Sequence, residues 1–197
     1  SPETMLSHSF FMRHTAEFYE FYRTDVLAPE AKPNRAHYAL ARMEQDQKLK
    51  AVITQNIDGL HTLAGSRNVL EIHGSVHRNY CMNCNREYEL SYVVDYPGPV
   101  PLCEKCKGVV RPDVVLYEEA LPEAVLEASV RAVAEADLFI VGGTSLVVYP
   151  AAGLLHYFRG KNLVMINRDI TPQDSRATLV FRENIGEVLD AAWPAHS

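Results

Sequence analysis

The 197 residues are enough to bury a substantial core, in one domain or one domain with a small insert. Hydrophobic residues make up 47% and charged residues 22%, and no apolar run reaches the roughly 18 residues of a membrane span, so disorder and membrane insertion are disfavoured. With 19 basic and 25 acidic side chains the formal charge is −6, which argues against binding to bare nucleic acid.

The chain begins "SPETML", without an initiator methionine and without the basic and apolar regions of a secretory signal. A cytoplasmic location is therefore expected. We also expect a monomer with no membrane and no direct nucleic-acid partner. The polar opening leads at once into an amphipathic stretch, which indicates that residues are missing upstream.

Short β-branched runs alternate with helical stretches along most of the chain. This alternation is typical of a Rossmann-like α/β fold, a parallel sheet with helices on both faces. In chain order we expect a helix over 34–49, a strand over 51–54, a helix over 122–136, a strand over 138–142, a helix over 150–159, strands over 163–167 and 178–181, and a helix over 184–193.

All four cysteines fall in two C-x-x-C pairs, "CMNC" and "CEKC". Two such pairs at this separation supply the tetrahedral sulfur shell that zinc favours. Two disulfides or four free thiols are the alternative, which the absence of a secretory signal disfavours. Because four protein ligands leave no open position on the metal, we expect a structural zinc. The predicted ligands are Cys81, Cys84, Cys103 and Cys106.

The zinc-binding stretch is flanked by strand-like sequence and contains the turn-rich "DYPGPVP", so it reads as an insert. The sequence therefore predicts three parts. Residues 1–50 form a helical segment packed on the main domain, residues 51–78 and 112–197 form the Rossmann-like domain, and residues 79–111 form a small zinc-ribbon module.

Polar or glycine-rich residues follow three of the predicted strands. Ligands of such sheets bind beyond the carboxyl ends of the strands, so we expect a shared crevice that suits a nucleotide. Gly142 and Gly143 would allow a phosphate to approach the backbone, near hydroxyl groups at a helix N-terminus. A tight strand-to-helix turn with an N-cap explains the same glycines. The residues at the strand ends are Gln55-Asn56-Ile57-Asp58, Gly143-Thr144-Ser145 and Asn167-Arg168-Asp169.

Over essentially its whole length the sequence resembles the sirtuins, the NAD-dependent protein deacylases. The resemblance rests on several motifs that occur together and in the family's order. They are "TQNIDGLH" (54–61), "EIHGS" (71–75), the two C-x-x-C pairs, "RPDVVLYEE" (111–119), "GGTSLVVYPAAG" (142–153) and "VMINRD" (164–169).

The resemblance implies an NAD site. In the family the Q-N-I-D tip lines the pocket for nicotinamide and its ribose, and the histidine of the H-G pair is the general base, which here is His73. The catalytic residues implied are His73, Asn56 and Asp58. The cofactor contacts implied are Gln55, Asn56, Ile57, Asp58 and His73 on the nicotinamide side, Gly143, Thr144, Ser145, Asn167 and Arg168 on the other, and Ile185 beside the adenine.

The family's reaction moves an acyl group from lysine to ADP-ribose. By resemblance, the acyl-lysine oxygen attacks the ribose carbon that bears nicotinamide, nicotinamide leaves, and His73 promotes capture by a neighbouring hydroxyl. An imidazole can accept a proton at cellular pH, which suits that role. For a lone histidine beside a glycine, a capped strand end is the plainer interpretation. For the other two nearby histidines we expect no catalytic role. We interpret His61 as a helix or loop side chain and His77 as a surface neighbour of the zinc module.

The resemblance also implies acetylated-lysine proteins as substrates. The peptide would lie as an added strand between residues 114–119 and 145–150, recognised mainly through its backbone. The apolar residues there suit the stem of a lysine, although a buried strand would look the same. The implied substrate contacts are Val114, Val115, Leu116, Tyr117 and Val147.

The sequence departs from the family pattern in two places. Nothing matches the G-A-G-x-S turn and first strand, so we expect that about one βα unit of the gene product precedes the given residues. "LYEE" (116–119) replaces the usual Phe-Gly-Glu, which stiffens a loop near the peptide. Relatives that remove acidic acyl groups carry a Tyr-x-x-Arg motif. Here the residue three positions after Tyr19 is Tyr22, and the arginine, Arg23, comes one position too late to match the motif. We therefore predict deacetylation over desuccinylation.

Two other functions remain open. A protein ADP-ribosyltransferase could use the same NAD pocket. A non-enzymatic zinc-ribbon adaptor with a decayed NAD fold is the second alternative, but an adaptor has no need of a base at the crevice.

Overall fold

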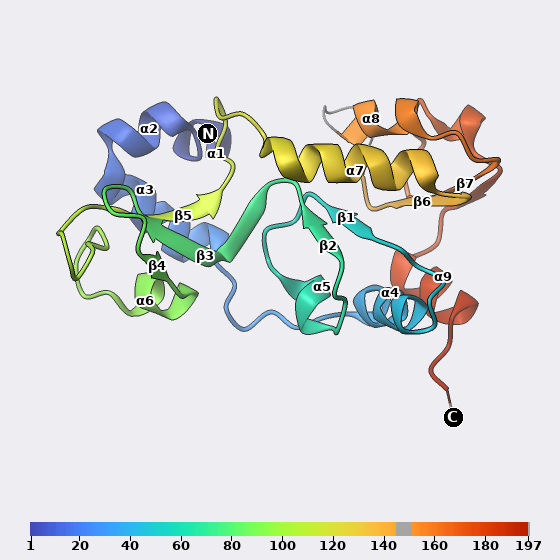
Figure 1. Ribbon diagram of the computed structural model, residues 1–197, viewed down its shortest axis with the longest axis horizontal. Helices are drawn as coiled ribbons and strands as arrows, with labels where there is room; N and C mark the ends of the chain where they lie inside the picture. Colours follow the sequence, from blue (N-terminus) through green and yellow to red (C-terminus); the bar gives the residue numbers. More distant parts are fainter. Residues whose placement is uncertain (145–150, 197) are drawn as a thin grey trace. The chain divides into compact units, whose positions relative to one another are not determined.

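The computed structural model describes residues 1–144 and 151–196, which form two compact units (Figure 1). The chain contributes several separate segments to each unit, so neither is a continuous stretch of sequence. The predicted three-part division stays a prediction. Unit 1 comprises Ser1–Ala31, Thr54–Gly59 and Glu71–Pro122, and unit 2 comprises Lys32–Ile53, Leu60–Leu70 and Glu123–Ser197.

Unit 2 is built on a parallel sheet of three strands in the order β6-β7-β8. The three predicted strands form, with boundaries shifted by no more than a residue. They were expected to be buried, but β8 lies at the edge of the sheet, and its Leu179 and Val180 are exposed. Gly142 pairs with Ile166 at the carboxyl ends of β6 and β7. The strands are β6 (Leu138–Gly142), β7 (Asn162–Ile166) and β8 (Leu179–Phe181).

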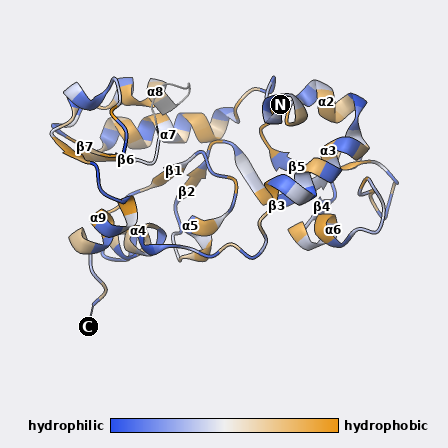
Figure 2. Ribbon diagram, turned by 180° about the vertical axis from the view of Figure 1, so that it is seen from behind, coloured by the Kyte–Doolittle hydropathy of each residue, from blue (hydrophilic) through white to orange (hydrophobic). Residues whose placement is uncertain are grey.

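Helices cover both faces of this sheet, which confirms the predicted layering. Side chains of β7 alternate between the faces, because successive residues of a strand point in opposite directions. Met165 packs with Leu155 in one cluster, while Ile166 packs with Ala39 and Leu189 in another. In Figure 2 β7 and much of α7 are coloured as hydrophobic.

Two helices of unit 2, α4 and α9, begin at asparagine caps. Asn34 caps α4: its Oδ1 accepts hydrogen bonds from the Ala36 and His37 amides at 2.9 and 3.3 Å. Asn184 caps α9 in the same way. The helices are α4 (Arg35–Gln45), α5 (Leu60–Leu63), α7 (Glu123–Glu135), α8 (Ala151–Leu154) and α9 (Ile185–Ala192), with 3-10 turns η2 (Leu155–Tyr157) and η3 (Asp174–Arg176).

The strand at 51–54 forms as β1 (Val52–Thr54) but pairs with β2 (Val69–Glu71) in a sheet of two strands. The Val52 amide donates to the Asn68 carbonyl, and the Ile72 amide donates to the Thr54 carbonyl. Sequence reasoning grouped this strand with those that became β6 and β7. Among the described residues its partner is the short local strand β2, which the apolar pattern did not reveal.

Unit 1 contains an antiparallel sheet in the order β4-β3-β5. Its long strand β3 starts directly after His73, and the β3–β5 register shifts between Ser75 and Asn79. The sheet thus links the residues around His73 to the cysteine-bearing segment in one element. The strands are β3 (Gly74–Cys81), β4 (Glu87–Tyr88) and β5 (Val110–Val114), and α6 (Leu90–Asp95) follows β4.

The amino-terminal helices supply the aromatic core of unit 1. Phe11, Phe18, Tyr19 and Tyr22 are almost completely buried and pack on one another, edge to face in most pairs. They share a cluster with Val110 and with two of the cysteines. The elements are α1 (Pro2–Met5), α2 (His8–Arg13), α3 (Thr15–Phe21) and a π-helical turn η1 (Tyr22–Val26).

Within residues 1–144 and 151–196, no helix has both the length and the apolar character needed to cross a membrane.

Candidate active site and metal centre

The polar tip that follows β1 is fixed by main-chain hydrogen bonds within unit 1. The Asn56 amide donates to Thr54 Oγ1 at 3.0 Å, and the Ile57 carbonyl accepts from the Val76 amide at 3.0 Å. Ile57 and Asp58 are half-buried, while Asn56 is exposed. The segment is therefore held on β3 by its backbone, with the Asn56 side chain accessible to a ligand.

His73 is joined to the same tip. Its Nδ1 lies 3.0 Å from the main-chain carbonyl oxygen of Gln55. A carbonyl oxygen can only accept, so this geometry assigns the hydrogen to Nδ1. In the neutral ring the lone pair is then on Nε2, the nitrogen that can take a proton from a ligand. The contact brings His73 together with the tip residues that the sequence named.

Gly74 allows this arrangement because only glycine fits there. Its φ is +78°, and an added Cβ would overlap the main-chain oxygen of Asp113 on β5. On the other side, the His73 carbonyl accepts from the Val115 amide at 2.9 Å. His73 is thus held between the tip and the residues that leave β5.

Those residues differ in how much surface they offer. Val114 and Leu116 are buried, with 7% and 5% of their surface exposed, and Leu116 belongs to the aromatic core. Tyr117 is 56% exposed, and Val115 is half-buried. Of the predicted substrate contacts in this segment, Val115 and Tyr117 are the ones whose side chains are accessible.

The four cysteines come together as predicted. Their sulfur atoms all lie within 4.8 Å of one another, in the manner of ligands around one ion. The Sγ atoms of Cys81 and Cys106 are 3.4 Å apart, and those of Cys84 and Cys103 are 3.6 Å apart, so these pairs are not disulfide-bonded. The cluster is compatible with a structural zinc ion.

Neighbouring donors favour the thiolate form, which a metal requires, at Cys81 and Cys103. The Tyr88 hydroxyl donates to Cys103 Sγ at 3.2 Å, which lowers the pKa of that thiol to about 6. The Asn83 amide lies 3.4 Å from Cys81 Sγ. Hydrogen bonds of this kind stabilise charge on sulfur and orient the ligands.

In unit 2 the tips of β6 and β7 are bonded to each other. The Asn167 side-chain Nδ2 donates to the Thr144 carbonyl oxygen at 2.9 Å, and the Gly143 amide donates to the Ile166 carbonyl at 3.2 Å. Gly143 is exposed, has a φ of +66°, and would have no heavy atom within 4 Å of an added Cβ. This exposed glycine supports the expected approach of a phosphate to its backbone, which stays a prediction.

The remaining cofactor candidates of this unit are not all brought together. Ile185, at the start of α9, packs on Gly142, where an added Cβ would overlap its Cδ1 atom. The close packing of Ile185 on β6 is therefore a second explanation for a glycine at position 142, besides the approach of a phosphate. Arg168 is exposed. Ser145 and Val147 lie outside the described residues.

Comparison with known proteins identifies the family. The sequence profile of the Sir2 family matches residues 1–150. The chain belongs to the Sir2 family. It is similar to a "NAD-dependent protein deacetylase" from Clostridium acetobutylicum, with 57% identity over 189 residues, which is 96% of this chain and 77% of the relative.

Solved structures of Sir2 proteins have the same fold. One described as "Sir2 bound to acetylated peptide" has a TM-score of 0.90 and 39% identity, and the match covers 95% of this chain and 81% of that one. Another, "Sir2-p53 peptide-NAD+", has a TM-score of 0.89 and 40% identity, covering 95% and 80%. The likeness therefore spans nearly all of this Sir2-family chain.

Sequence reasoning missed one residue next to the candidate site. His77 Nε2 lies 3.0 Å from the Asp58 carbonyl oxygen, and the His77 ring lies over Gly59, where an added Cβ would come within 2.5 Å of the ring. This exposed residue of β3 thus holds the far end of the Q-N-I-D tip. The available clue was the spacing of His73 and His77, which are four positions apart just before and within a strand, because residues at even spacing in a strand lie on the same face.

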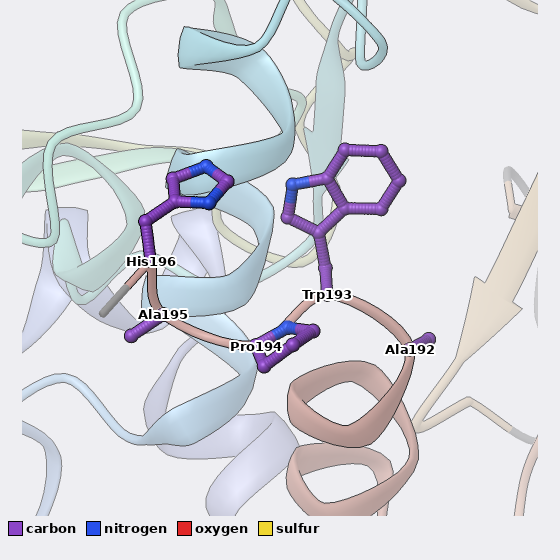
Figure 3. Close-up of a pocket in the computed structure, with 5 residues that line it drawn as sticks. All are labelled: Ala192, Trp193, Pro194, Ala195 and His196. Atoms are coloured by element: carbon purple, nitrogen blue, oxygen red, sulfur yellow. The ribbon is translucent and has the colours of Figure 1, made fainter.

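A surface hollow at the carboxyl end of unit 2 is not part of the candidate site of this Sir2-family protein. It is lined by Ala192, Trp193, Pro194, Ala195 and His196 (Figure 3). The Trp193 indole donates to Asp46 at 2.7 Å, so the ring serves to fasten the last residues to the end of α4. None of the sequence-predicted site residues lines it.

Proposed function

We propose that the protein is an NAD-dependent protein lysine deacetylase. Membership of the Sir2 family and a relative named for this activity support the reaction class. The proposal for this chain depends on one observation: His73 Nδ1 donates a hydrogen bond to the Gln55 carbonyl. This contact leaves Nε2 available to act as a base beside the Q-N-I-D tip.

The donor set fits NAD. Bound NAD would supply an electrophilic ribose carbon, with nicotinamide as the leaving group. In our proposal Gln55, Asn56, Ile57 and Asp58 bind the nicotinamide and its ribose, and the His73 imidazole takes a proton from a ribose hydroxyl. Asn56 and Asp58 orient the groups that react. The adenosine half is held by Gly143, Thr144, Ser145, Asn167 and Arg168, with Ile185 beside the adenine.

Zinc has a structural role in this proposal. Four sulfur ligands would leave the metal without a position for water or substrate. The ion would join the Cys81–Cys84 turn at the end of β3 to the Cys103–Cys106 turn ahead of β5. It would thereby hold the sheet whose first strand follows His73.

The acetyl group is the proposed acyl substrate. An acidic acyl group would need a cation free to bind it, but Arg23 is engaged elsewhere. Its Nε donates to the Val93 carbonyl at 3.0 Å and its Nη1 to the Gly98 carbonyl at 3.1 Å. Tyr22 is only 1% exposed and lies in the aromatic core. These contacts support a preference for acetyl-lysine over succinyl-lysine.

The proposed substrates are acetylated-lysine proteins, contacted by the accessible side chains of Val115 and Tyr117 and by Val147. Val114 and Leu116, the other contacts implied by the sequence, are buried and would support this segment from the core side. The protein would act as a monomer, without direct nucleic-acid or membrane partners. We propose a cytoplasmic location, where the four clustered thiols would stay reduced and available to metal.

The decisive experiment compares the protein with His73→Ala and with His14→Ala, a surface histidine paired with Glu17. Each is incubated with NAD and an acetyl-lysine peptide, and free lysine peptide and O-acetyl-ADP-ribose are quantified. We expect His73→Ala to lose about 10²–10⁴-fold in kcat and His14→Ala to match the wild type. Equal product formation by His73→Ala would refute the role of His73. Labelled protein without O-acetyl-ADP-ribose would instead favour ADP-ribosyl transfer.

A further inference from the structure

The turn that follows β5 is hydrogen-bonded to the beginning of the chain. The Tyr117 amide donates to the Leu6 carbonyl at 3.0 Å, and the His8 amide donates to the Tyr117 carbonyl at 2.9 Å. Together they form a single parallel bridge between Ser7 and Tyr117. A segment near residue 7 thus lies beside the segment in which the proposed substrate contacts fall.

Glu118 extends this connection with its side chain. Its carboxylate accepts from the Ser9 amide at 2.8 Å and from the Ser9 hydroxyl at 3.0 Å. Its φ is +75°, a left-handed conformation that is unfavourable for a residue with a Cβ. The two charge-assisted hydrogen bonds offset that strain and hold the turn in one conformation.

The adjacent Glu119 has a different role. It binds Arg111 through both oxygens, at 2.8 and 3.1 Å, and accepts from the Leu116 amide at 2.9 Å. His8 Nδ1 lies 2.9 Å from the same carboxylate. These contacts fix the base of the turn and do not involve Glu118, so a change at Glu118 should leave them in place.

We infer that Glu118 is a positioning residue for the substrate peptide, which it serves by fastening the Tyr117–Glu119 turn to Ser9. The inference rests on the proposed function. An added strand binds through main-chain groups, and a receptor segment that is already ordered loses less entropy when the peptide binds. The main-chain amide and carbonyl of Tyr117 are already bonded to Leu6 and His8, so what Tyr117 would present to the peptide, in the orientation that the Glu118 contact sets, is its exposed ring.

The test measures the Kd of a fluorescein-labelled acetyl-lysine peptide and the steady-state constants of deacetylation. Glu118→Ala keeps the strained backbone but loses both bonds, so we expect Kd and peptide KM to rise about tenfold. The kcat and the KM for NAD should stay within about twofold, because the residue does not contact the reacting groups. Glu118→Gln retains an acceptor oxygen and should recover most of the peptide affinity.

Ser9→Ala removes the hydroxyl donor but keeps the amide, so its effect should be smaller than that of Glu118→Ala. The double variant should be no worse than Glu118→Ala alone, since the two residues act through one contact. Glu89→Ala, an exposed glutamate of the same unit, is the control and should match the wild type. An unchanged Kd in Glu118→Ala, a loss confined to kcat, or additive effects would overturn the inference.

Direct binding separates this inference from the proposed reaction. A wild type that binds the peptide but does not deacetylate it would contradict the proposed function, while the effect of Glu118→Ala on Kd would still decide the inference. A wild type that does not bind the acetyl-lysine peptide at all would overturn both.

Discussion

His73 Nδ1 donates to the main-chain oxygen of Gln55 across 3.0 Å, and this contact fixes the tautomer of the imidazole. The acceptor is a backbone atom, so no substitution at position 55 removes it directly. Its geometry depends instead on how β3 begins, and therefore on Gly74 and on the approach of β5.

Gly74→Ala should be strongly destabilising. The new Cβ would overlap the Asp113 carbonyl oxygen at a φ of +78°, so the backbone strain and the displacement of β5 should together cost about 3 kcal/mol. Deacetylation should fall as well, because His73 moves with the strand. Urea unfolding and kcat measure the two effects.

Gly65→Ala is the matched control for this change. Gly65 also has a positive φ, but the nearest atoms to an added Cβ are 3.8 and 3.9 Å away. We expect a loss of about 1 kcal/mol, from backbone strain alone. If both variants lost the same stability, the close approach of Asp113 would not be the reason for Gly74.

Cys84→Ser should remove the metal and unfold the small module. A structural zinc contributes on the order of 10 kcal/mol to the folding of zinc modules, so the free energy of unfolding should fall by at least ~3 kcal/mol. Zinc content by mass spectrometry and thermal unfolding measure the result. Ser91→Ala, an exposed change on α6, should keep both at wild-type values. Zinc retained in full by Cys84→Ser would contradict a four-cysteine site.

Asn167→Asp should weaken NAD binding selectively. The change replaces the Nδ2 donor with an oxygen that repels the Thr144 carbonyl, so the tips of β6 and β7 should separate. We expect the KM for NAD to rise about tenfold, equivalent to ~1.4 kcal/mol, with little change in the KM for peptide. Asn162→Asp, at the exposed amino end of the same strand, is the control. A similar rise in both variants would mean that the tip itself is not involved.

Glu119→Gln should lower the free energy of unfolding at neutral pH. It should also make that free energy less dependent on pH between about 4.5 and 2. Burial raises the pKa of Glu119, but hydrogen bonds from Arg111, Leu116 and His8 outweigh it and hold the pKa at about 2, against an ordinary 4.5. Ionised Glu119 therefore stabilises the fold above pH 4.5, and this contribution is lost as the pH falls from 4.5 towards 2.

At pH 7 the variant should be less stable by about 2 kcal/mol, because Arg111 loses a charged partner. The difference from the wild type should narrow as the pH is lowered below 4.5. Urea unfolding at a series of pH values gives both quantities, with the exposed Glu87→Gln as control. A constant difference down to pH 3 would show that the charge of Glu119 is not the source of the stability.

The features that sequence reasoning predicted well are set by local patterns. Runs of β-branched residues predicted β6, β7 and β8, and C-x-x-C spacing predicted the cluster of four cysteines, because each pattern acts within a few residues. The sequence placed Asn167 at the end of a strand, and the structure adds its hydrogen bond to the Thr144 carbonyl; its contact with a cofactor stays a prediction.

The features that were not predicted depend on pairings between distant residues. Strand β3 pairs with β5 across more than twenty intervening residues, through a register shift and past Pro112, and no periodicity marks such a partner. Ser9 and Glu118 are 109 positions apart. The available clue was chemical, because Glu118 stands where the family usually has glycine. In the structure Glu118 has a left-handed backbone conformation, and its carboxylate accepts hydrogen bonds from the amide and the hydroxyl of Ser9.

The two units are interleaved along the chain, which passes from one to the other after residues 31, 53, 59, 70 and 122. A fragment of residues 71–122 would contain all four sulfur ligands and His73 but not the Gln55 carbonyl. It could capture a metal ion and still leave the imidazole free to exchange tautomers. Cutting the chain into contiguous pieces would therefore separate metal binding from the alignment of His73. Restoring that alignment would require complementation with residues 54–59, which carry the Gln55 carbonyl, and with residues 1–31, which supply the aromatic core.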